Sequence, residues 1–356
     1  MRKPSPEKAD TQLVANSRRA GKSYCFNDSH NPDLPAGMWF QKSCEGLTLF
    51  LVYYSQACRW SRCLGCNLPS LMSSRHVSFK SLMAQTDHLL ANPEITARRQ
   101  QVKKIILSNN GSMLDEETFS STALMYALAR FNMHFPGLRV LSVETRPEYV
   151  DLAELEFISR ALKEGQTPTA LEIAIGFEAY DDHIRNRVFH KGLTVPAFEA
   201  LVKKMAPYGF QLKCYFMQKP VPDMTDEAAV EDIRRAIEYL SFTAQQFKVS
   251  INMHLNPTYI AKGTLLEEAF KKGRYAPPRL RDVARAASYA RGKPVSMFIG
   301  LTEEGLAVEG GSFIRHGESA LVRQLEAFNR TQDFDILDRL CNARPLKNKK
   351  EVRLHL

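Results

Sequence analysis

The sequence predicts an α/β fold built on a parallel sheet, because short apolar runs alternate with amphipathic helical patterns along most of the chain. Six of these runs have the length and composition of buried strands, and they cover residues 47–54, 104–108, 139–144, 170–175, 210–216 and 247–252. Their spacing of roughly 35 residues leaves room for a crossover helix after each strand. The periodicity fits an open, partial (β/α) barrel as well as a doubly wound sheet.

Residues that commonly cap helix N-termini precede four of the helical patterns. They are Ser78, Asp115, Asp151 and Thr194. Glu154 follows Asp151 at the spacing of a capping box, which strengthens the third of these predictions. Beyond the sixth strand, an apolar run over residues 295–301 and two further helical patterns continue the α/β character.

The chain divides into three predicted parts. Residues 1–44 form a basic tail and lead-in, because residues 1–37 lack hydrophobic periodicity and contain four prolines. Residues 45–270 hold the six strands, and residues 271–356 form a C-terminal extension that ends in a second basic tail.

The positive charge of the chain is concentrated at its ends. The net charge is +9, of which residues 1–23 contribute +4 and residues 344–356 another +4, so the body is close to neutral. Basic tails of this kind suit contact with nucleic-acid phosphates. They are equally typical of solvated, mobile ends, and the charge pattern does not decide between the two readings.

The composition is that of a globular protein rather than a fibrous or disordered one, with 44% hydrophobic and 24% charged residues. The longest apolar run, residues 47–54, is too short to span a bilayer. The N-terminus shows no apolar stretch of the kind found in signal peptides. We therefore expect a cytoplasmic protein with no membrane contact, whose seven cysteines are reduced thiols.

Three of the cysteines lie close together, directly after the first predicted strand. Cys58, Cys63 and Cys66 form a C-x4-C-x2-C pattern at a position where parallel α/β proteins build active sites. Three thiolates this close can bind zinc or an iron–sulfur cluster, and they can also stay unliganded. Structural zinc needs a fourth protein ligand, which is missing at finger-like spacing. A four-iron cluster on three cysteines leaves one iron open, and we favour this interpretation.

Polar residues follow the other predicted strands at the ends that converge in a parallel barrel. They occur in residues 108–112, 144–147, 176–178, 219–220 and 252–257. Any one of them can be a loop cap or a solvated side chain. Five such strand ends facing one cysteine loop indicate an active site at this end of the sheet.

These motifs together resemble the radical S-adenosylmethionine (radical SAM) superfamily. Within it, residues 45–290 resemble the branch of the elongator catalytic subunit and the radical SAM subunit of archaeosine synthase. The matching stretches are residues 110–115, 144–148, 175–178 with 190–192, 219–220, and 256–258 through 263–264 to 275–278. The usual cysteine spacing in the superfamily is C-x3-C-x2-C, one residue shorter than here. Residues 310–318 also lack the cysteine that the archaeosine branch tends to carry near its C-terminus.

The resemblance implies a partial (β/α)6 TIM-type barrel of radical SAM type with a C-terminal α/β extension. It implies a [4Fe–4S] cluster on Cys58, Cys63 and Cys66, with S-adenosylmethionine (SAM) bound at the fourth iron. The cluster cleaves SAM to a 5′-deoxyadenosyl radical, with an electron from a flavodoxin- or ferredoxin-type donor. SAM contacts are expected from Asn110, Gly111, Ser112, Glu144 and Glu178. Trp60 is a candidate for the adenine contact.

The sequence is consistent with three functions. The leading one is a radical SAM enzyme that modifies a nucleic-acid base, with tRNA as the partner, because the basic tails and the resemblance agree. A radical SAM enzyme acting on a small molecule or a peptide is the second. A non-catalytic scaffold, in which the cysteines hold zinc, is the third.

Overall fold

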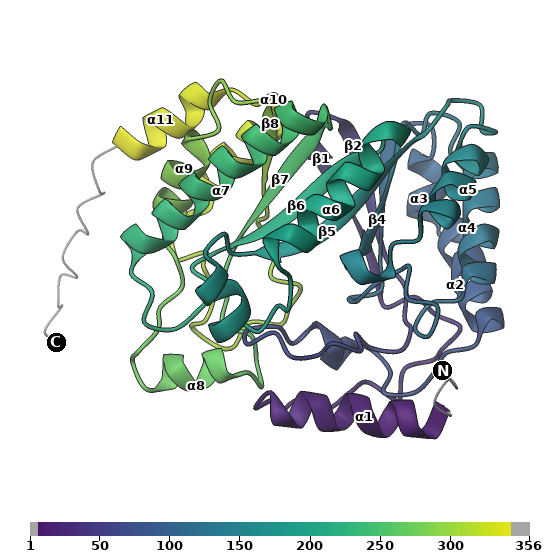
Figure 1. Ribbon diagram of the computed structural model, residues 1–356, viewed down its shortest axis with the longest axis horizontal. Helices are drawn as coiled ribbons and strands as arrows, with labels where there is room; N and C mark the ends of the chain where they lie inside the picture. The colour runs from purple at the N-terminus through teal and green to yellow at the C-terminus, as the bar shows by residue number, and fades with distance from the viewer. Residues whose placement is uncertain (1–5, 343–356) are drawn as a thin grey trace, which may run out of the picture.

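The computed structural model describes residues 6–342 and shows one curled sheet with helices packed on its outer face (Figure 1). The strands of this part of the chain lie in sequence order from one edge of the sheet to the other. β1 pairs antiparallel with β2, and every later pair is parallel. The strands are β1 (Gly37–Ser43), β2 (Gly46–Val52), β3 (Val102–Ser108), β4 (Val140–Thr145), β5 (Ala170–Glu178), β6 (Gln211–Gln218), β7 (Ile251–Pro257) and β8 (Val295–Ile299).

Helices connect the parallel strands and cover the convex side of the sheet (Figure 1). The helices are α1 (Pro6–Arg19), α2 (Phe79–Ala91), α3 (Pro93–Arg98), α4 (Ser121–His134), α5 (Leu152–Leu162), α6 (Val195–Met205), α7 (Asp226–Phe247), α8 (Leu265–Lys271), α9 (Leu280–Ser288), α10 (Ser319–Thr331) and α11 (Phe334–Asn342). None of those within residues 6–342 is long and apolar enough to cross a membrane. In Figure 1, α1 and α8 lie along the lower edge, at a distance from the helices that cover the sheet.

The predicted partial parallel barrel is confirmed, with the six predicted strands present as β2 to β7. The apolar run of the extension forms β8, which pairs with β7 in the same sheet. The N-caps predicted at Ser78, Asp151 and Thr194 are also confirmed, because each side chain accepts a hydrogen bond from a backbone N–H three residues on.

Four local predictions are wrong. Residues 1–37 are not all irregular, since α1 forms within them, and residues 37–43 form the unpredicted strand β1. Asp115 does not cap a helix, because α4 begins six residues later, at Ser121. The sixth strand begins at Ile251 rather than at residue 247, because α7 continues to Phe247 and ends with Lys248 in the left-handed conformation (φ 55°). The C-terminal basic tail lies outside the described residues.

Alternate residues along the strands separate an apolar outer layer from an interior that is mostly polar, apart from a small apolar cluster of Phe50, Val52 and Ile106 on β2 and β3. The outward residues form the main core with the helices, and they include Leu49, Leu51, Ile105, Leu107, Leu141, Val143, Ile173, Leu212, Met253 and Ile299. The inward residues between them include Lys104, Ser142, Glu144, Glu172, Lys213, Tyr215, Asn252, His254 and Asn256. A side-chain-filled parallel barrel normally has a bulky apolar interior. The polar interior here therefore indicates a site rather than a second core.

Buried ion pairs close the barrel at the N-terminal ends of the strands. The ammonium of Lys104 on β3 donates to Glu172 on β5 at 2.8 Å and to Glu45, in the β1–β2 turn, at 2.8 and 3.0 Å. Lys213 on β6 donates to Asn252 on β7 at 3.1 Å. Lys104 and Glu172 are each at least 98% buried, so each charge depends on its partners for compensation. The open end of the barrel is the opposite one.

Side-chain amides from α10 satisfy the free edge of β8. Asn329 accepts a hydrogen bond from the backbone N–H of Ile299 and donates one to its carbonyl, both at 2.8 Å. Gln332, just after α10, makes the same pair of bonds with Met297. The backbone carbonyl of Asn329 also accepts from the N–H of Cys44, beside β1. One helix thereby joins the two edges of the sheet, which do not pair with each other.

Replacing Asn329 with leucine is expected to lower the free energy of unfolding by about 2–4 kcal/mol. The change leaves the buried N–H and carbonyl of Ile299 without partners, and each unsatisfied group costs about 1–3 kcal/mol. Urea unfolding followed by circular dichroism measures the change. Gln324→Leu, at an exposed position of α10, is the control. Equal stability of the two variants would show that these bonds do not hold the sheet edge.

Candidate active site

The three clustered cysteines lie at the open end of the barrel. Cys58, Cys63 and Cys66 follow β2 and line a cavity of about 560 Å³. All three are half-buried free thiols. Across residues 6–342, no three cysteine, histidine or carboxylate side chains converge closely enough to hold a single metal ion. A four-iron cluster takes each thiolate on a different iron, so its ligands surround a space instead of meeting at one point. Three thiols on a cavity wall fit that requirement.

Burial controls the protonation of these thiols when no metal is bound. It raises the pKa of Cys63, and it raises the pKa of Cys66 to about 12, with the neighbouring Cys63 as the next largest cause. Iron binds thiolates, so loading the site displaces protons from thiols that are neutral at pH 7. The local cations Lys191 and Lys22 oppose these upward shifts in pKa, and they would partly balance the charge of bound thiolates.

Lys22 anchors the cysteine loop from the N-terminal segment. Its ammonium donates to the backbone carbonyls of Cys63, Leu64 and Cys66 at 2.5, 2.9 and 2.8 Å. The side chain is 7% exposed, although the charge pattern of the sequence placed it in a basic tail. Burial lowers the pKa of Lys22, whereas the nearby cysteine thiolates raise it. The part of that tail nearest the barrel is therefore built into the site.

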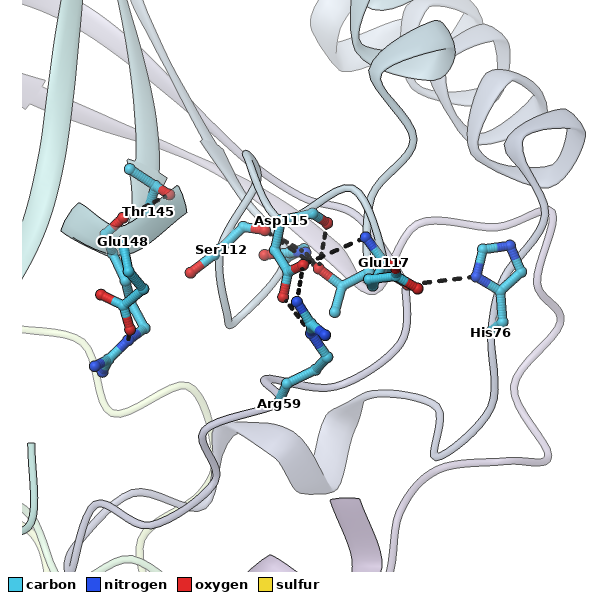
Figure 2. Close-up of polar contacts among 10 residues, drawn as sticks. Arg59, His76, Ser112, Asp115, Glu117, Thr145 and Glu148 are labelled. Atoms are coloured by element: carbon cyan, nitrogen blue, oxygen red, sulfur yellow. Dashed lines mark hydrogen bonds and ion pairs between the residues drawn. The ribbon is translucent and has the colours of Figure 1, made fainter. Parts of the chain in front are cut away.

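Arg59 ties the cysteine loop to the turn that follows β3 (Figure 2). Its guanidinium donates two hydrogen bonds to the carboxylate of Asp115, at 2.7 and 2.6 Å, in a bidentate ion pair. Asp115 is almost fully buried, and the arginine also lies over the ring of Tyr149, 5.5 Å from its centroid. This partner lies 56 residues away in the sequence, and the same carboxylate also accepts from the backbone N–H of Glu117 at 3.3 Å.

Trp60 anchors the same loop to the segment after β5. Its indole N–H donates to the carbonyl of His190 at 2.8 Å. The guanidinium groups of Arg146 and Arg62 lie 4.5 and 4.9 Å from its ring. A Cβ at Gly192 would come within 2.3 Å of the indole, and this glycine has a φ of +68°. Residues 190–192 thus position the indole of Trp60. Its ring already contacts the guanidinium groups of Arg62 and Arg146.

The Asn110–Ser112 turn packs directly against the cysteine loop. A Cβ on Gly111 would lie 3.2 Å from the Cα of Cys58, so glycine permits this close approach. Asn110 and Gly111 line the cavity, whereas Ser112 is buried beside it and is not part of the lining. The Nδ2 of Asn110 and the hydroxyl of Ser112 are buried and have no hydrogen-bond partner among the described residues. Such atoms are available to a ligand.

Glu144, at the end of β4, also lines the cavity. It accepts a hydrogen bond of 2.5 Å from the hydroxyl of Tyr215 on β6. Burial raises the pKa of this glutamate, and hydrogen bonds from Ser108 and Tyr215 oppose the shift. Tyr215 was not predicted from the sequence, although its alternation with Lys213 in the predicted strand placed both on one face.

Glu178, at the end of β5, is held by an ion pair of 2.8 Å with Lys191. Its own φ is +76°, and a register shift in the strand precedes it. Gly176 makes room for the pair, because a Cβ there would lie 2.5 Å from both the carboxylate oxygen and the ammonium. All three residues line the cavity. The structure thus brings Asn110, Gly111, Glu144 and Glu178 to the same space as the three cysteines.

The chain has relatives among archaeal proteins, although no family model matches it. It is 29% identical over 264 residues to archaeosine synthase subunit beta of Methanosarcina acetivorans, a match that covers 72% of each protein. It is 21% identical over 325 residues to an uncharacterized protein of Methanocaldococcus jannaschii, covering 88% of this chain and 86% of that one. A solved structure of Methanocaldococcus infernus Elp3 aligns with a TM-score of 0.44 and 16% identity, over 64% of this chain. This chain spans about half of that structure's length.

Proposed function

We propose that this chain, similar in sequence to the archaeosine synthase branch of the radical SAM enzymes as its motifs predicted, is a radical SAM enzyme that modifies a nucleic-acid base. The observation that carries the proposal is the composition of one cavity wall. Cys58, Cys63 and Cys66 share this wall with a turn that has unpartnered buried polar atoms, at the C-terminal mouth of a parallel barrel.

The thiolates of the three cysteines would hold a [4Fe–4S] cluster. When bound and reduced by an external donor, this cluster would supply one electron to SAM, which would cleave to methionine and a hydrogen-abstracting 5′-deoxyadenosyl radical. The protein's own part is to orient these groups and to exclude water. Lys22 fixes the backbone of the cysteine loop, and Arg59 fixes it against the Asn110–Ser112 turn.

The SAM contacts expected from the resemblance have support in the hydrogen-bonding capacity of the cavity. The backbone carbonyls of Asn110 and Gly111, which line the cavity, can accept from the methionyl ammonium of SAM, whereas Ser112 is buried beside this lining. Glu178 has a carboxylate oxygen beyond the one that Lys191 occupies, and this oxygen can accept from a ribose hydroxyl. Glu144 is already hydrogen-bonded by Ser108 and Tyr215.

The nucleic-acid substrate is supported by the relatives and by charge. Two of the relatives are archaeosine synthase subunits. Arg18 and Arg19 are exposed at the end of α1, on the side of the molecule that carries the cysteine loop. Lys22 is not available to phosphates, because the loop carbonyls occupy all three of its hydrogens. An RNA contact would therefore use residues 1–19 and the C-terminal basic segment.

Two measurements test the proposal. Protein purified without oxygen should be brown and should cleave SAM to methionine and 5′-deoxyadenosine when a reductant such as dithionite is added. RNA from a deletion strain, analysed by mass spectrometry of its nucleosides, should lack a modification present in the wild type. Colourless protein that binds zinc would establish the scaffold alternative. Cleavage of SAM together with an unchanged RNA profile would move the substrate to a small molecule or a peptide.

A further inference from the structure

Two stacked aromatic rings on β1 and β2 form part of the cavity wall. Trp39 on β1 and Phe50 on β2 are register partners, and their rings stack with centroids 4.2 Å apart and planes inclined by 10°. Both residues line the cavity. Phe50 is 8% exposed and lies in a small apolar cluster with Val52 and Ile106, which fixes the pair against the inner face of the sheet. Trp39 is half-buried and covers the cavity side of this cluster.

A buried histidine on β7 lines the same cavity. His254 on β7 is 6% exposed and lies between Tyr215 and Phe298, with ring centroids 4.8 and 4.7 Å away. Its Nδ1 has no hydrogen-bond partner among the described residues. Gly300 leaves space beside it, since a Cβ there would lie 3.0 Å from Nε2 of His254. A buried, unpartnered ring nitrogen in a cavity is a free hydrogen-bonding group.

The two tryptophans of the chain differ in their availability to a ligand. Trp60, on the cysteine loop, is engaged by Arg62, Arg146 and the carbonyl of His190. Trp39 has Phe50 as its stacking partner and no cation over its ring among the described residues. A planar ligand can therefore stack on Trp39 without displacing a protein group.

We propose that Trp39 and His254 form the subsite for the target base of the substrate, with the base stacked on Trp39 and hydrogen-bonded at its edge by His254. The inference rests on the proposed function and names the residues that would hold the target base of the substrate. Asn256, which also lines the cavity, supplies an amide for the same edge of the base. Base–aromatic stacking tolerates any base, whereas edge hydrogen bonds select one.

The test measures nucleotide binding to the full-length, cluster-containing protein at saturating SAM, which fills the SAM subsite. Isothermal titration calorimetry with the four nucleoside 5′-monophosphates, and with ribose 5-phosphate as the control that lacks a ring, gives the affinities. Trp39→Leu should weaken the best nucleotide roughly tenfold or more, since stacking contributes about 1–3 kcal/mol per base. Ribose 5-phosphate should bind equally to both proteins. Trp39→Phe should restore most of the affinity, and His254→Phe should reduce the preference among bases.

Phe242→Leu is the matched control, because this phenylalanine is 62% exposed on α7, outside the barrel. It should leave nucleotide affinity unchanged. Nucleotide affinities that are the same for wild type and Trp39→Leu, or a loss that Trp39→Phe does not reverse, would overturn the subsite. SAM cleavage without substrate separates the two proposals. If the wild-type protein fails to cleave SAM, the proposed radical function is wrong. Nucleotide titration without SAM would then still show whether Trp39 binds the base.

Discussion

Replacing Cys63 with alanine is expected to abolish reductive cleavage of SAM and to lower the iron content of reconstituted protein. A four-iron cluster on three cysteines has no spare protein ligand, and no other cysteine in the described residues lines the cavity. Cys58→Ala and Cys66→Ala should behave in the same way. Iron analysis, absorption near 400 nm and chromatographic detection of 5′-deoxyadenosine measure the three effects.

The controls for this result are cysteines elsewhere in the chain. Cys25→Ala and Cys341→Ala, both at exposed positions, should retain iron and SAM cleavage. Thermal unfolding of the metal-free proteins should show that Cys63→Ala folds as the wild type does. Full SAM cleavage by Cys63→Ala would show that the ligand assignment is wrong. Zinc in the wild type, lost in the same variants, would favour the scaffold.

The sequence predicts the sheet well because its signals are local. Short apolar runs identified β2 to β6 to within a few residues. Within such a strand, alternation separates inward residues such as Lys213 from outward ones such as Leu212. Where two local signals compete, the prediction is less good. Phe247 packs against the core as the last residue of α7. Its apolar side chain also fits the start of the apolar run that follows, so the sequence placed the beginning of the strand four residues too early.

The positions of the predicted strand ends were enough to predict that Glu144, Glu178 and the Asn110–Ser112 turn lie at one edge of the sheet. The partners that hold these residues could not be predicted, because they come from distant segments. Tyr215 on β6 donates to Glu144 on β4, and Arg59 of the cysteine loop forms a bidentate ion pair with Asp115. Long-range pairs of this kind leave no periodic pattern in the sequence.

Lys22 is the clearest example of a contact that the sequence does not predict. Nothing in the neighbouring sequence distinguishes it from a lysine in a solvated tail. An ammonium has three hydrogens, and the cysteine loop offers three carbonyls within 2.9 Å of Nζ. The loop provides one of these contacts for itself, because the N–H of Cys66 also donates to the carbonyl of Cys63 at 3.2 Å, and Lys22 supplies the others. A segment more than forty residues upstream therefore completes the structure of the loop.

Replacing Lys22 with methionine is consequently expected to lower the free energy of unfolding of the metal-free protein by about 3 kcal/mol. The variant keeps the length and the apolar stem of the side chain, and it removes a charged donor from carbonyls that are buried or partly buried. Hydrogen bonds to charged groups contribute roughly 1.5–3 kcal/mol. The carbonyls of Leu64 and Cys66 lose the ammonium as their partner, whereas the carbonyl of Cys63 keeps its bond from the N–H of Cys66. Urea unfolding measures the loss, and the rate of iron release to a chelator should rise in the reconstituted protein.

Arg19→Met distinguishes this positioning role from a general effect of charge. It removes the same charge three residues earlier, from an exposed side chain at the end of α1. We expect unchanged stability and unchanged iron release for that variant. If Lys22→Met and Arg19→Met released iron at the same rate, the three carbonyl contacts would not hold the loop. A rate that rises only in Lys22→Met would show that the N-terminal segment acts on the cysteine loop directly, because both variants alter the long-range charge equally.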